Sequence, residues 1–342
     1  MQISAIIISV FIIFSIAQRT SSDGYQWPAT LSEWQLFEEP LAELKPNDGV
    51  IPYTVNSSLY SDYAYKSRFI KLPEGKSAQY SPSSAFEMPE GTILIKNFYY
   101  LNDERKPDDG QRVLETRLIV KDNGKWYAMT YRWNDVQTEA YRAIAGGVTD
   151  ISWTDNTGKK RQLHYLIPDA NQCKNCHNKN DQLLPLGITA RQLNSQTEEN
   201  QLIQWSKQGM LIDIPDHFSN RNRLVDYTND RLPLEARARS YLDANCGHCH
   251  SPEGSARTSG LNLNYDESNP HSFGVMKPPV AAGRGSGGMQ YSIVPGKSNQ
   301  SILLYRMESG DPGIRMPEIN RQIPHTEGIA LIREWIKNMD DE

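Results

Sequence analysis

The chain has 342 residues, of which 38% are hydrophobic, and a formal net charge of −5. This length and composition predict two or three compact domains with ordinary cores and exclude a disordered chain. Because there is no excess of basic residues, a nucleic acid is not expected as a partner.

The first residues predict export. Residues 3–17 form an almost unbroken apolar run, and a polar stretch follows at residues 18–23. This pattern is typical of a secretory signal peptide, which we place at residues 1–20, because the run is short for a membrane span. An uncleaved membrane anchor is the alternative, since no Lys or Arg precedes the run. The expected location is the periplasm or another exported compartment.

Strand signals fill residues 50–168. Residues 91–101, 112–121 and 125–134 are rich in β-branched and aromatic side chains and are separated by turn-forming segments. They predict neighbouring antiparallel strands. Alternation in the third segment predicts one face that packs against a core or a haem edge, formed by Tyr127, Met129, Tyr131 and Trp133.

Helical patterns follow the strands. Residues 195–211 have helical composition, and residues 233–246 and 326–339 carry apolar stripes with helical spacing. The predicted fold class is therefore α+β. It comprises an antiparallel β-rich domain at residues 21–185, a helical connector at residues 186–230 and an all-α domain at residues 231–342.

A repeated motif is the main indication of function. Residues 173–177 (CKNCH) and 246–250 (CGHCH) both read Cys-x-x-Cys-His, and they contain all four cysteines of the chain. This spacing is typical of c-type haem attachment, in which two thiols bind the porphyrin and the adjacent histidine binds the iron. The sequence predicts two haem c groups, attached to Cys173, Cys176, Cys246 and Cys249, with His177 and His250 as iron ligands.

Two other roles for these cysteines fit less well. Cysteine pairs that share a zinc ion usually lie about 15–20 residues apart. The two pairs here are much farther apart, and a histidine follows each of them. A thioredoxin-like motif normally occurs once, at the start of a helix in a βαβ unit.

Residues 231–342 resemble a class I cytochrome c domain, because a helix ends in the haem motif, loops follow and an amphipathic helix closes the chain. The segment 313–317 (GIRMP) resembles the methionine-proline loop of that family. This resemblance implies Met316 as the sixth ligand of the second iron, and His/Met ligation raises the reduction potential and leaves no open position. The remaining methionines of this region are expected to be packing residues: Met276, Met289, Met307 and Met339.

Three other features lie near the second motif. His248 is expected to be a polar surface residue, although it and His271 are possible ligands. The segment 283–288 (GRGSGG) matches a dinucleotide-binding pattern but does not link a strand to a helix, so we reject nucleotide binding. Its Arg284 is a candidate partner for a haem propionate.

The first motif has no methionine-proline loop after it, so the sixth ligand of the first iron stays open. Candidates are His164, Met129, Met210 and Lys96, or no protein ligand. The segment 88–96 (MPEGTILIK) resembles cytochrome P460 and its β-rich cytochrome c′ relatives. That resemblance implies that Lys96 matches a lysine cross-linked to the haem. The long 103–111 loop and the chain beyond the motif depart from that family, and an ordinary strand lysine is the alternative.

A wider resemblance covers nearly all of the mature chain. Four segments are similar to a bacterial family of dihaem c-type cytochromes of unassigned physiological role: 167–173 (IPDANQC), 242–250 (LDANCGHCH), 294–297 (VPGK) and 325–331 (HTEGIAL). The resemblance implies two haems and export, but no reaction.

The predicted function is a periplasmic dihaem electron carrier that exchanges electrons with redox partner proteins. The alternative is a haem oxidoreductase, in which an open first iron acts on a small oxidant or nitrogen compound. A gas sensor or a structural subunit of a respiratory complex is a third interpretation. No catalytic residue is assigned, membrane contact is expected only through an uncleaved anchor, and the sequence does not predict the oligomeric state.

Overall fold

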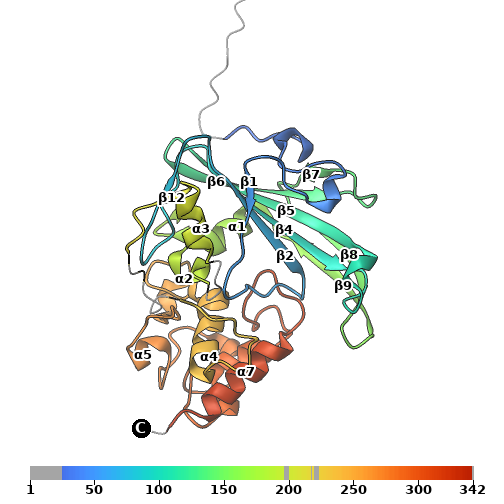
Figure 1. Ribbon diagram of the computed structural model, residues 1–342. Helices are drawn as coiled ribbons and strands as arrows, with labels where there is room; N and C mark the ends of the chain where they lie inside the picture. Colours follow the sequence, from blue (N-terminus) through green and yellow to red (C-terminus); the bar gives the residue numbers. More distant parts are fainter. Residues whose placement is uncertain (1–24, 196–199, 217, 219–222, 341–342) are drawn as a thin grey trace, which may run out of the picture.

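The computed structural model describes residues 25–195, 200–216, 218 and 223–340. Among these residues it has a large antiparallel sheet and seven α-helices, which confirms the α+β class (Figure 1). The predicted signal peptide, residues 1–20, lies outside the described part of the chain. In that described part, no helix combines the length and the apolar character needed to cross a bilayer.

Six antiparallel strands form the main sheet, in the order β1-β2-β4-β5-β6-β7. Three of them confirm the predicted strands, because β-branched and aromatic side chains suit a pleated, half-buried surface. Asn123 and Gly124 join β5 to β6, and their positive φ angles of 50° and 73° suit a two-residue hairpin turn. The strands are β1 (Val50–Pro52), β2 (Tyr65–Lys71), β4 (Ile93–Leu101), β5 (Gln111–Asp122), β6 (Lys125–Trp133) and β7 (Ala140–Arg142).

One face of the sheet packs on the N-terminal segment. Tyr131 and Trp133 of β6 are buried in a cluster with Leu31, Leu36 and Phe37. The predicted apolar face of β6 therefore contacts a protein core, which was one of its two expected partners.

The opposite face of the sheet supports the middle of the chain. Ile70 and Leu94 pack there with Trp205 of α3 (Gln201–Lys207) and with residues of α2 (Ala190–Leu193). In Figure 1, α1, α2 and α3 lie on this side of the sheet, above the C-terminal helices.

The connector differs from its prediction, because the helix expected at residues 195–211 is only the short α3. The side-chain oxygen of Asn200 accepts the Leu202 N–H at 2.9 Å and caps the start of the helix. Gly209, with a φ of 70°, follows its end. Next, β12 (Leu211–Ile212) pairs in parallel with β3 (Ala78–Gln79) in a separate two-stranded sheet, so the connector returns to the β-rich region. Residues 196–199 lie outside the described residues.

A hairpin leads from the sheet to the first motif. It consists of β8 (Gly147–Thr154) and β9 (Lys160–Ile167), which pair in antiparallel register. The following elements are α1 (Ala170–His177), β10 (Asn178–Lys179) and β11 (Gln182–Leu183).

The last third of the chain is helical and confirms both predicted helices there. Its core joins Ala238 and Leu242 of α4 to Ile332, Trp335 and Ile336 of α7. The helices are α4 (Leu234–Leu242), α5 (Pro270–Phe273), α6 (Ile302–Glu308) and α7 (Thr326–Lys337), and a π-helical turn, Asp243–Gly247, extends α4.

The loop before β2 joins the sheet to the helices. The Ser57 hydroxyl donates to the carbonyl oxygen of Ser240 at 3.0 Å, and the Tyr60 N–H donates to the Asn245 side chain at 2.7 Å. The Tyr60 ring stacks on the His325 ring with a centroid separation of 4.1 Å. These buried contacts fix the two regions relative to each other.

The junction predicts a pH-dependent stability. Burial lowers the pKa of His325 to about 4, whereas the unfolded value is about 6.5. The unfolded chain therefore binds the extra proton first on acidification, so stability present at pH 7 falls as the pH drops. We expect this histidine to cost about 2 kcal/mol between pH 7 and pH 5. Urea unfolding of the wild type and His325→Phe, which keeps a ring against Tyr60, measures the difference. Equal losses in both proteins would contradict it.

Candidate functional site

The two Cys-x-x-Cys-His segments lie against each other, between the sheet and the C-terminal helices. The thiols of Cys176 and Cys249 and a ring nitrogen of His248 lie within 4.8 Å of one another. The Cys249 sulfur also lies 3.8 Å from the carbonyl oxygen of Asn175. All four cysteines are free and partly buried. The fold thus unites two motifs that are distant in the sequence.

The first motif is carried by α1. The Asp169 carboxylate accepts the N–H groups of Asn171 and Gln172, both at 2.8 Å, and the Gln172 side chain accepts the Asp169 N–H at 3.0 Å. This capping box fixes where the helix begins. Since an α-helix has about 3.6 residues per turn, Cys173 and Cys176 then lie on one side of it.

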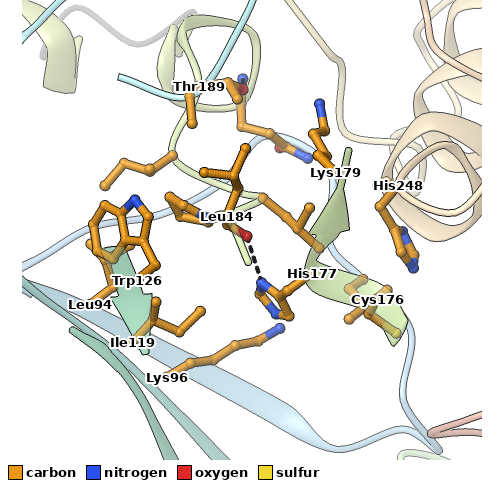
Figure 2. A pocket seen from close by; sticks show the side chains of 18 of the residues that line it. Leu94, Lys96, Ile119, Trp126, Cys176, His177, Lys179, Leu184, Thr189 and His248 are labelled. Carbon is orange, nitrogen blue, oxygen red and sulfur yellow. Dashed lines mark hydrogen bonds between the residues drawn. The ribbon is translucent and has the colours of Figure 1, made fainter. Parts of the chain in front are cut away.

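His177 ends α1 in a defined tautomer. Its Nδ1 lies 3.0 Å from the carbonyl oxygen of Leu184, a contact drawn in Figure 2. A carbonyl only accepts, so Nδ1 carries the proton and Nε2 keeps its lone pair. Burial lowers the pKa of His177 to about 4, and the cations Lys96 and Arg117 act in the same direction. The ring is therefore neutral, as a metal ligand must be.

His250 of the second motif has the same tautomer. Its Nδ1 lies 3.0 Å from the Ser259 hydroxyl, which donates its own proton to the Ala256 carbonyl at 2.8 Å. Nδ1 must therefore donate, and Nε2 keeps its lone pair. Burial lowers the pKa of His250 as well, and the nearby Arg306 guanidinium adds to the effect.

A large cavity connects the two motifs. It has a volume of about 1050 Å³, at the upper end of the usual range for organic ligands and cofactors of about 300–1,000 Å³. Figure 2 shows Leu94, Ile119 and Trp126 beside His177, with His248 on the far side of Cys176. Sheet, α1 and the start of the second motif therefore all contribute to its wall.

The residues around this cavity fit a c-type haem. Cys173 and Cys176 line it and can form thioether bonds, apolar sheet residues can cover a macrocycle, and His177 holds a free Nε2. Cationic side chains also line the wall, Lys96 and Arg117 among them, and these could pair with propionates.

Met316 lies in a loop that is anchored beside His250. Its N–H donates to the Arg306 carbonyl at 3.0 Å, and its own carbonyl accepts from Arg321 at 2.5 Å. The Arg306 guanidinium donates to the Ile314 carbonyl at 2.8 Å and also acts on the pKa of His250. The loop is thus held near the second motif, and ligation by Met316 stays a prediction.

Of the four candidates for the sixth ligand of the first iron, two lie outside the cavity beside His177 and two line it. His164 is 82% exposed and pairs with Asp150 on the β8–β9 hairpin, outside the cavity that Cys176 and His177 line. Met210 packs in the cluster with Trp205 and does not line that cavity. Met129 and Lys96 do line it. Figure 2 shows the Lys96 amino group directed toward His177.

One further expectation requires correction. His248, expected at the surface, is partly buried and lines the cavity beside Cys176, because the packing of distant segments decides its position. Arg284 is exposed and pairs with Asp311 at 2.9 Å, and its guanidinium lies beside Gly313 in the loop of Met316. Its contact with a propionate of the second haem stays a prediction. The site also includes Arg68 and Arg117, which no local sequence signal marked.

Comparisons with protein-family models, curated proteins and solved structures find no match to this chain. The function is therefore inferred from the residues themselves.

Gly254 predicts a selective effect on the second motif. A Cβ at this buried glycine would lie 2.2 Å from the Cys249 carbonyl oxygen, so the backbone must shift. We expect Gly254→Ala to lose about 1–3 kcal/mol of unfolding free energy and to lower haem attachment at Cys246 and Cys249 only. Denaturant unfolding and the masses of the two motif peptides measure both effects. Gly310→Ala, where no atom lies within 4 Å of the new Cβ, is the control. Equal behaviour of the two variants would contradict the prediction.

Proposed function

We propose that this protein is an exported dihaem c-type cytochrome that transfers electrons. One haem is attached to Cys173 and Cys176 with His177 on its iron, and the other is attached to Cys246 and Cys249 with His250. The predicted signal peptide supports export. Redox proteins are the expected partners.

One observation carries the proposal: the two motifs touch each other beside a single cavity, which is lined by Cys173, Cys176 and His177 of the first motif and by Gly247 and His248 of the second. The thiols of Cys176 and Cys249 and a ring nitrogen of His248, from separate parts of the chain, lie within 4.8 Å of one another. Electron transfer slows steeply with distance, so two haems held at touching attachment sites would exchange electrons fast. A protein that needed only one haem would gain nothing from this arrangement.

The chain's own residues have clear parts in such a transfer. When bound, haem iron supplies a one-electron couple whose potential depends on its axial ligands. Leu184 and Ser259 hold the imidazoles of His177 and His250 neutral and correctly oriented. The apolar residues Ile119 and Trp126 exclude water from one side of the cavity. Asn175 provides contact between the two motifs.

The layout supports a division between the two haems. The second motif lies in a helical region in which α4 and α7 pack on each other, as expected for a class I cytochrome c domain. With Met316 as sixth ligand, its iron would have a raised potential and no open position. The first motif faces the sheet and the cavity.

A second candidate function follows from the same geometry. Two thiols and one imidazole within 4.8 Å are three of the four ligands of a structural zinc site. In that case Cys176, His248 and Cys249 would hold a metal ion and join the two regions without electron transfer.

Mass spectrometry of the exported protein separates these functions. We expect each motif peptide to carry one haem, and we expect no stoichiometric zinc. His248→Ala should keep both haems, because His248 is not an iron ligand in the proposal. The exposed His271→Ala serves as the control. Unmodified cysteines, or zinc that is lost only from His248→Ala, would replace the proposal with the metal site.

A redox titration tests Met316. Replacing it by Ala removes the sulfur ligand, so the potential of one haem should fall on the order of 0.1 V, within the range of about 0.8 V that axial ligands set. The ferrous variant should also bind carbon monoxide at that iron. Met276→Ala changes an exposed methionine and should alter neither property. Identical titration curves for the wild type and Met316→Ala would exclude Met316 as the ligand.

A further inference from the structure

A row of three cations crosses the sheet at the cavity wall. Arg68 of β2 pairs in register with Lys96 of β4, and Lys96 pairs in register with Arg117 of β5. Residues directly opposite each other in neighbouring strands point to the same face of a sheet. All three side chains line the cavity that contains Cys173, Cys176 and His177. This cation row is therefore part of the candidate site.

The row is unfavourable for the fold by itself. Like charges directly opposite each other destabilise a strand pair, and here two such pairs share Lys96. Burial adds to this cost, because charged groups are costly to remove from water without a partner. A sheet that needed only stability would not keep three adjacent cations.

Only one of the three cations has an anionic partner among the described residues. Arg117 forms a two-point contact with Glu115, with Nη2 2.5 Å and Nε 2.8 Å from its oxygens. Neither Arg68 nor Lys96 forms an ion pair in that part of the chain. Glu115 is moreover shared with the Tyr165 hydroxyl, which donates to it at 2.7 Å. The row therefore retains an excess of positive charge.

The neighbouring ring of Phe98 compensates the positive charge of the row only in part. Lys96 and Arg117 approach the ring of Phe98 at 4.9 Å and 4.2 Å, and Lys66 lies 5.9 Å from it. A cation over an aromatic face gains a modest attraction, but a ring carries no net charge. Among the described residues, Lys66 and Lys96 still lack an anionic partner beside this ring.

Three other cations of the cavity wall have hydrogen-bond or ion-pair partners. Arg191 pairs with Asp243 at 3.1 Å and also with Asp266, and Lys179 lies 3.8 Å from Glu253. Lys121 donates to the Met88 carbonyl at 2.6 Å. Arg68 and Lys96 are therefore the members of the row that lack an anionic partner, and burial together with the neighbouring cations lowers the pKa of Lys96, so a bound anion would restore its charge.

We propose that Arg68, Lys96 and Arg117 form an anion site that binds a carboxylate or a small oxyanion beside His177. Guanidinium groups donate two parallel hydrogen bonds to such planar or tetrahedral anions, and a lysine adds a point charge. The anion has two possible sources with this same chemistry. It is a propionate of the haem attached to Cys173 and Cys176, or a free oxyanion that reaches the first iron. The first source depends on the proposed function; the second does not.

Calorimetry tests the free anion. Nitrite, sulfate and acetate are titrated separately into purified wild-type protein, Lys96→Gln and Arg68→Gln. If a free anion is the occupant, at least one probe binds the wild type, and each variant weakens it at least about tenfold, because charge-assisted hydrogen bonds are lost. Lys125→Gln removes an exposed lysine at the edge of β6 and should leave binding unchanged.

Resonance Raman spectra test the propionate. If haem supplies the anion, none of the probes binds the wild type, and the propionate bending bands shift in Lys96→Gln and Arg68→Gln but not in Lys125→Gln. A shift confined to the two site variants separates contact with the propionate from a general change in the haem surroundings.

The proposal is overturned if no probe binds and the propionate bands are unchanged in both variants. Failure of the haem proposal is recognised separately, from unmodified motif peptides in mass spectra. The calorimetric titration remains valid on such haem-free protein.

Discussion

One buried side chain, Asn245, ties the second motif to the sheet. It accepts the Tyr60 N–H at 2.7 Å and donates to the Tyr241 carbonyl at 2.9 Å, and it directly precedes Cys246. An unmet buried hydrogen-bond group costs about 1–3 kcal/mol, so this contact fixes the position of the π-helical turn against the loop before β2. The approach of Cys249 to Cys176, and with it the cavity, depends on that position.

Local sequence patterns predicted most of the elements. The strands β4, β5 and β6 and the helices α4 and α7 follow from alternation and from apolar stripes, because these periodicities reflect which side is buried. The connector was predicted poorly, since Asn200 and Gly209 shorten α3 and residues 211–212 join a strand. Helical composition is a weak signal when capping and tertiary pairing act against it.

The sequence predicted the individual residues of the site, but it did not predict that the two motifs lie in contact. The cysteines, His177 and His250 follow from a motif, whereas the contact between motifs is a long-range property that no local pattern contains. His248 therefore appeared to be a surface residue. The cation row was equally hidden, because Arg68, Lys96 and Arg117 become neighbours only through the register of three strands.

The two motifs have different surroundings, which favours different tasks for the two haem sites. His250 lies among residues that enclose it, with Ser259 on one side and the Arg306-anchored loop of Met316 nearby. His177 instead faces a cavity of about 1050 Å³ with uncompensated positive charge in its wall. On the proposed function, the second motif suits a site that passes electrons without binding anything. The first suits a site where an anion sets the potential or meets the iron. A simple electron carrier would need only an enclosed haem site like that of the second motif. The charged cavity beside the first motif therefore points to an additional task at that site.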